Sequence, residues 1–212
     1  MIELRARRVM ILAPHTDDGE FGCGGTIARL LEEHSEVYYT AFSVCEQSVP
    51  YGFEKDELEH ELMSATAALG VPRANVFVHR YEVRRFPEVR QAILQDILTV
   101  KEKVLPDLVF MPCLDDIHQD HQVIAAEGLR AYKNTTILSY EMPWNNLSIV
   151  TSAFVGLEER HLTRKIDALS CYQTQTFRHY ASEEFIRSLA RTRGAQVAMR
   201  YAETFQLVRL VY

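Results

Sequence analysis

The chain has 212 residues, of which 47% are hydrophobic and 25% are charged, as in an ordinary globular protein that buries a core. A formal net charge of −6 argues against a nucleic-acid partner or an anionic membrane surface, since either needs a basic face. No apolar run is long enough to span a bilayer, and the first residues lack the apolar region of a signal peptide, so we expect a cytoplasmic protein.

The first predicted element is a short buried strand over residues 9–13, because five apolar residues are followed directly by a proline. His15, Asp17 and Asp18 then stand at the tip where the chain turns. Ligands of open α/β sheets bind outside the carboxyl ends of the strands. A histidine and two carboxylates at such a tip indicate half of a metal site. The alternative is a polar loop whose following glycines only permit tight packing.

The segments that follow alternate between helical and strand patterns. Helical periodicity spans residues 26–33, 54–69, 89–104 and 121–132, and strand patterns span residues 36–44, 75–78, 108–111 and 136–140. Four successive strand–helix units predict a Rossmann-like three-layer α/β fold, with a mainly parallel sheet and helices on both faces. The tail is predicted to add strands over residues 148–155 and 203–211 and helices over residues 158–172 and 182–199. No linker or repeat interrupts the pattern, so we expect one domain over residues 1–212.

A second polar loop follows the predicted strand over residues 108–111. It and the start of the next helix contain Asp115, Asp116, His118, Asp120 and His121. If this strand lies beside the first one, as in a doubly wound sheet, the two loops face each other across one crevice. His15, Asp18 and one of His118 or His121 then meet at a common point. Two imidazoles and a carboxylate are the ligands of a catalytic zinc, and they suit Fe(II) equally.

The other polar residues of the two loops fit supporting roles in a hydrolase. A zinc ion held in this way lowers the pKa of its water to about 7 and polarises a carbonyl. Adjacent side chains diverge, so Asp17 is better placed as the general base than as a second ligand beside Asp18. The histidine that does not bind the metal can stabilise an oxyanion or protonate a leaving amine. Asp120 can orient an imidazole, or it can be the N-cap of the next helix if the loop is only a solvated turn.

Both loops resemble the motifs of a known family. His15-Thr-Asp-Asp-Gly-Glu20 resembles the His-Pro-Asp-Asp-x-Glu signature of the LmbE/PIG-L family of zinc-dependent N-acetylglucosaminyl deacetylases. His118-Gln-Asp-His121 resembles the His-x-Asp-His motif of that family. Thr16 departs from the usual proline of the first motif. The likeness extends to the tail, over residues 165–172, 193–194 and 201–205.

The resemblance implies a ligand set and a reaction. Zinc would be bound by His15, Asp18 and His121, with Asp17 as the general base and His118 as the electrophilic or general-acid partner. The substrate would be an N-acetylated sugar or a related small molecule, from which hydrolysis releases acetate. The resemblance identifies neither the particular substrate nor whether the protein forms a homo-oligomer.

Two other functions stay open on the residues alone. The glycines between Gly22 and Gly25 are similar to the phosphate-binding loop of a nucleotide-binding Rossmann-like module, although a histidine and two aspartates separate them from the strand. A metal-dependent phosphoesterase with two ions would need further ligands, for which Asp115 and Asp116 are candidates.

The residues that bind substrate are not determined by the sequence. The candidates, in the loops after the third and fifth predicted strands, are Arg84, Arg85, Trp144 and Asn145. A solvated surface arginine or a packed loop tryptophan is the alternative for each. The four cysteines are far apart in the sequence and are expected to be structural thiols.

Overall fold

Strand β1 (Arg8–Ala13) lies inside the sheet and buries both of its faces, which explains its unbroken apolar sequence. Val9 and Ile11 pack into one core cluster, and Met10 and Leu12 pack into the other. The computed structural model describes residues 6–211, and seven strands of these residues pair in the order β3-β2-β1-β4-β5-β7-β6. The other strands are β2 (Glu36–Ala41), β3 (Val76–Val78), β4 (Leu108–Pro112), β5 (Thr136–Tyr140), β6 (Ala153–Leu157) and β7 (Tyr201–Arg209).

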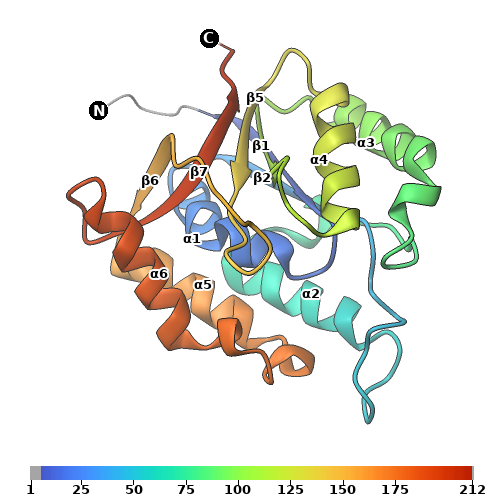
Figure 1. Cartoon of the computed structure of the whole chain (residues 1–212), viewed down its shortest axis with the longest axis horizontal. Coiled ribbons are helices and arrows are strands. Elements are labelled where there is room, and N and C mark those ends of the chain that lie inside the picture. The colour runs from blue at the N-terminus through green and yellow to red at the C-terminus, as the bar shows by residue number, and fades with distance from the viewer. Residues whose placement is uncertain (1–5, 212) are drawn as a thin grey trace.

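Helices cover both faces of this sheet (Figure 1). They are α1 (Asp18–Glu32), α2 (Glu57–Leu69), α3 (Arg90–Val104), α4 (Gln119–Ala131), α5 (Glu159–Ser170) and α6 (Glu183–Ala195). The core cluster of α1, α2 and α5 lies against one face of the sheet, and the cluster of α3 and α4 lies against the other. The predicted three-layer α/β fold is therefore confirmed.

The parallel part of the sheet brings the two polar loops together. β1 pairs in parallel with β2 on one side and with β4 on the other, with Ile11 opposite Phe110. The carboxyl ends of β1 and β4 therefore meet at the same edge of the sheet. Among the strands of residues 6–211, β7 alone runs opposite to the other six, because it pairs antiparallel with both β5 and β6.

Helix α1 begins at Asp18, eight residues before the predicted start at residue 26, so the glycines that follow Asp18 lie inside the helix. Glycine has a low helix propensity, and the helix is not continuous through the glycine-rich segment. It kinks at Cys23, whose φ of −148° is not helical. The kink frees hydrogen-bonding groups of the backbone, and two buried side chains satisfy them. Lys165 Nζ donates to the Phe21 carbonyl at 2.6 Å, and the Glu203 carboxylate accepts from the Thr26 N–H at 2.7 Å.

This arrangement leaves no phosphate-binding loop between Gly22 and Gly25. The Gly25 N–H donates to Glu203 Oε1 at 3.1 Å, and the same carboxylate pairs with Lys165 Nζ at 2.6 Å. The N–H groups that could receive a phosphate are thus already bound to a buried carboxylate. The observation argues against the nucleotide-binding alternative.

Replacing Gly22 by alanine is expected to destabilise the protein, because a Cβ at this position would overlap the ring of Tyr140. Overpacking of this kind costs about 1–3 kcal/mol of the free energy of unfolding, which urea titration measures. Gly24→Ala is the matched control, since its Cβ would meet Lys165 Cγ at 3.0 Å, a milder contact than the overlap between a Cβ at Gly22 and Tyr140 Cδ2. Equal stability of the Gly22→Ala variant and the native protein would show that close packing does not require this glycine.

The remaining boundaries differ from the predicted ones mainly at the ends of elements. The strand predicted over residues 148–155 is observed as β6, five residues later, because the segment after β5 forms a loop that bridges Asp116 with Asn146. Among residues 6–211, no helix is both long enough and apolar enough to cross a lipid bilayer.

Candidate metal centre and active site

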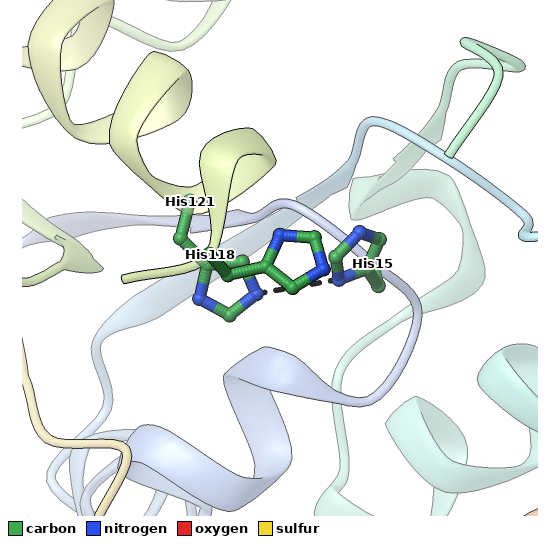
Figure 2. A group of neighbouring side chains, drawn as sticks. All are labelled: His15, His118 and His121. Carbon is green, nitrogen blue, oxygen red and sulfur yellow. Dashed lines mark hydrogen bonds between the residues drawn. The ribbon is translucent and has the colours of Figure 1, made fainter. Parts of the chain in front are cut away.

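The site lies where the loop after β1 meets the start of α4. His15 follows β1, and Asp18 is the first residue of α1. His118 is the N-cap of α4, and its Nδ1 accepts the backbone N–H of Asp120 at 3.2 Å. The alternative that made Asp120 the N-cap is therefore wrong, because α4 begins two residues earlier than predicted. Figure 2 shows the three imidazoles from these two segments side by side.

Three donor atoms of the predicted ligands form a small triangle. His15 Nδ1 lies 3.1 Å from Asp18 Oδ2, and His121 Nε2 lies 3.2 Å from the same oxygen. The third side, between His121 Nε2 and His15 Nδ1, measures 3.3 Å and is the dashed line in Figure 2. Ligand atoms about 2.0–2.1 Å from a tetrahedral zinc lie about 3.3 Å from one another. The three residues therefore have the spacing that fits such an ion.

His118 lies next to this triangle. One nitrogen of His118 lies within 4.8 Å of nitrogens of His15 and His121, so a set of three histidines is a second candidate ligand group. The triangle that includes Asp18 is tighter, and its mix of imidazole and carboxylate is common in catalytic zinc sites. The Nδ1 of His118 is already occupied as an acceptor, which leaves its Nε2 as the atom for contact with a ligand.

Each of the two histidines in the triangle has a carboxylate behind its other ring nitrogen. His15 Nε2 lies 3.0 Å from Asp120 Oδ2, and His121 Nδ1 lies 2.8 Å from Asp116 Oδ2. Such pairs fix the tautomer and the orientation of metal-binding imidazoles. Asp120 thus has the contact expected for a residue that orients an imidazole, whereas sequence reasoning missed the corresponding role of Asp116.

Removing the carboxylate charge behind His121 is expected to weaken metal binding by about 10- to 100-fold. Asp116→Asn tests this in a competition between the protein and a chelator. Asp115→Asn is the matched control, because this neighbouring carboxylate is exposed whereas Asp116 is fully buried. An equal loss of affinity in both variants would mean that the position of Asp116 behind His121 has no special effect.

The carboxylates also determine the charge of the cluster. Burial opposes the charged form of His121, but Asp18 and Asp116 outweigh it and raise the pKa of His121 to about 10. For His118, burial and the neighbouring rings of His15 and His121 lower the pKa to about 4. His118 is therefore a neutral imidazole at pH 7, and its Nε2 carries the proton because Nδ1 accepts a hydrogen bond.

Asp17 differs from Asp18 in its surroundings. It is the N-cap of α1, but its carboxyl makes no capping hydrogen bond and lines the open cleft. Burial and the adjacent charge of Asp18 raise the pKa of Asp17 to about 6, although Arg178 and His15 act in the opposite direction. A carboxylate with a raised pKa and no capping partner can accept a proton near neutral pH.

Glu20 is linked to the loop that carries His15 through two tyrosine side chains. The hydroxyls of Tyr39 and Tyr172 both contact the carboxyl of Glu20, and both donate to the Thr16 carbonyl, at 2.9 and 2.8 Å. Burial raises the pKa of Glu20 to about 8, so the carboxyl is mainly protonated at pH 7 and can donate to a tyrosine oxygen. Glu20 therefore contributes to the site by holding the loop backbone.

An open cleft of about 250 Å³ leads from solvent to the three histidines. Of the four predicted candidates for substrate contact, Arg84, Trp144 and Asn145 line it. Arg85 does not, because its Nη2 pairs with Glu88 Oε2 at 2.6 Å on the surface. The lining also includes residues that the sequence did not single out, namely Cys45, Ser48, Gln175, Arg178 and Tyr180.

The two-metal alternative lacks its second set of ligands within residues 6–211. Asp115 is exposed, and Asp116 is committed through both oxygens, since Oδ2 contacts His121 and Oδ1 accepts the His118 N–H at 2.8 Å. The three histidines are the one group of this kind that the described residues assemble. A phosphoesterase with two ions is therefore disfavoured.

Comparisons with known proteins identify similar sequences and folds. Residues 10–132 match the PIG-L family, which is described as GlcNAc-PI de-N-acetylase. The uncharacterized deacetylase YaiS of Escherichia coli K12 is 24% identical over 177 residues, which cover 80% of this chain and 92% of YaiS. The matched segment of the family contains every residue of the candidate centre, from His15 to His121.

Proteins whose solved structures share this fold catalyse more than one reaction. N,N'-diacetylchitobiose deacetylase from Pyrococcus horikoshii superposes with a TM-score of 0.74 at 20% identity, over 96% of this chain and 84% of that one. GalB of Pseudomonas putida KT2440, a 4-carboxy-2-hydroxymuconate hydratase, superposes with a TM-score of 0.75 at 17% identity, over 97% of this chain and 98% of that one. At such identities the likeness establishes the fold, and the reaction has to be argued from the site.

Proposed function

This chain belongs to the PIG-L family, and on that premise we propose that it is a zinc-dependent N-deacetylase that hydrolyses the acetamide of an N-acetylated sugar or a related small molecule. The observation that carries the proposal is the triangle of His15, Asp18 and His121, with sides of 3.1, 3.2 and 3.3 Å, at the base of an open cleft. When bound there, zinc supplies Lewis acidity, which lowers the pKa of water and polarises a carbonyl.

The residues around the triangle supply the proton transfers of amide hydrolysis. The Asp17 carboxylate takes one proton from the water molecule as that water attacks the amide carbonyl. His118, neutral and protonated on Nε2, donates a hydrogen bond to the oxygen on which negative charge develops. The proton held by Asp17 then passes to the nitrogen as the C–N bond breaks, so the products are acetate and a free amine.

The proposal is tested by metal analysis together with product analysis. Protein purified without added metal is expected to contain about one zinc per chain and to release acetate from one or more members of a panel of N-acetyl sugars. A chelator should abolish this activity, and zinc should restore it. Failure of the protein to bind any metal after reconstitution would overturn the proposal, and restoration by iron in place of zinc would correct the identity of the metal.

A further inference from the structure

Arg84 lines the cleft and has an unusual backbone conformation. Its φ of 71° lies in the left-handed region, which side chains other than glycine seldom adopt. Two contacts hold it there: its N–H donates to Asp120 Oδ2 at 2.5 Å, and its carbonyl accepts from Gln119 Nε2 at 3.4 Å. Asp120 also contacts His15, so the position of Arg84 is tied to the candidate metal centre. Strain of this kind tends to occur at functional sites.

The guanidinium of Arg84 has spare donors. Its Nη2 donates to the Ser48 hydroxyl at 3.2 Å, and no carboxylate of residues 6–211 forms an ion pair with it. Five N–H groups are available on a guanidinium, and they suit the paired oxygens of a carboxylate or a phosphate. Arg85 is the opposite case, because Glu88 already occupies its Nε and Nη2 at 3.1 and 2.6 Å.

A second cationic side chain lines the same cleft. Arg178 donates through Nε to Gln175 Oε1 at 2.5 Å and contacts the Tyr180 hydroxyl, and it too forms no ion pair within the described residues. Its positive charge acts to lower the pKa of Asp17, the proposed general base. The chain as a whole carries a net charge of −6, so an anionic substrate needs local positive charge at the cleft.

We propose that Arg84, with Ser48 beside it, binds an anionic oxygen group of the substrate, and that the enzyme therefore prefers an N-acetylated sugar bearing a phosphate or a carboxylate. This inference rests on the proposed deacetylase function and specifies its substrate class. Arg84 acts in binding and specificity, whereas the acetamide reacts at the histidines. The positive charge of Arg178 supports the same preference from another segment of the cleft wall.

The test compares neutral and anionic substrates of the zinc-loaded protein. The panel consists of N-acetylglucosamine, its 1-phosphate, its 6-phosphate and its C6 carboxylate. We expect kcat/KM to be at least about 10-fold higher for one anionic member than for the neutral sugar. The preferred member shows whether phosphate or carboxylate is recognised and at which carbon. A neutral sugar that is hydrolysed as well as every anionic member would overturn the inference.

Arg84→Gln and the matched control Arg85→Gln identify the residue responsible. Arg84→Gln should lower kcat/KM for the anionic substrate, mainly through KM, by about 10- to 100-fold more than it lowers kcat/KM for the neutral sugar. Arg85→Gln should alter neither. An equal loss for both substrates in Arg84→Gln would assign the residue a structural role and overturn the inference.

A binding measurement separates this inference from the proposed function. Titration calorimetry with the phosphate and carboxylate forms of glucosamine, the amine products, does not depend on turnover. If no member of the panel releases acetate but Arg84→Gln weakens binding of one anion by about 10-fold or more, the anion site stands and the deacetylase proposal fails. Equal affinity of the native and Arg84→Gln proteins for every anion would overturn the anion site.

Discussion

Replacing Asp17 by asparagine is expected to leave the zinc content unchanged and to lower kcat by about 10²- to 10⁴-fold, the range that a general base contributes. The carboxyl of Asp17 lines the cleft and makes no capping hydrogen bond, whereas Asp18 faces both histidines of the triangle. Asparagine has nearly the same shape as aspartate but cannot take a proton from water. The measurement is metal content by mass spectrometry, alongside single-turnover acetate release.

Retained zinc with lost turnover separates a base from a ligand. Loss of the metal in Asp17→Asn would show that this residue is a ligand, and the role given to it here would be wrong. Native turnover would exclude Asp17 as the base. Thermal unfolding of the variant gives the necessary control, since a folded protein is required for either conclusion.

Replacing the adjacent Asp18 by asparagine is expected to give the opposite pattern, with both metal and activity lost. Asp18 Oδ2 lies 3.1 Å from His15 Nδ1 and 3.2 Å from His121 Nε2, so the variant removes the one anionic corner of the triangle. We expect zinc affinity to fall by more than about 100-fold, beyond the range for residues that only orient a ligand. Competition with a chelator of known affinity measures this loss.

The pair of variants is informative because the two residues are neighbours in the chain. A general effect of removing one negative charge from the loop would appear in both variants, whereas a ligand effect appears only in Asp18→Asn. Native zinc affinity in Asp18→Asn would favour the alternative set of three histidines, which also has its donor atoms within 4.8 Å of one another. In that case His118 would be a ligand and could not act as the electrophilic partner.

The location of the candidate site could be predicted because it follows from two local patterns and one rule of topology. The apolar run that forms β1 and the one that forms β4 each end in a loop rich in histidine and aspartate. In a doubly wound sheet the carboxyl ends of neighbouring parallel strands meet at one edge. Parallel pairing of these two strands therefore brings the loops that carry His15, Asp18 and His121 together.

Other parts of the site could not be predicted because they depend on which side chains are buried. Asp115 and Asp116 are equivalent in the sequence, yet Asp116 alone is buried, and it alone contacts His121. Arg84 and Arg85 are likewise equivalent until the left-handed conformation of Arg84 and the Glu88 contact of Arg85 distinguish them. Arg178, which adds positive charge to the cleft wall, lies 160 residues after Asp18 in the sequence.

The start of α1 shows the same division between local and long-range effects. The predicted helical periodicity begins only at residue 26, and the four glycines just before it have a low helix propensity. The helix forms nevertheless, since Lys165 and Glu203 satisfy the backbone groups at its kink. The sequence by itself thus determined the alternation of strands and helices, the edge at which the proposed ligands meet and the residue types there. The tertiary structure alone decided which equivalent residue takes which role, because burial and charge pairing depend on segments distant in the chain.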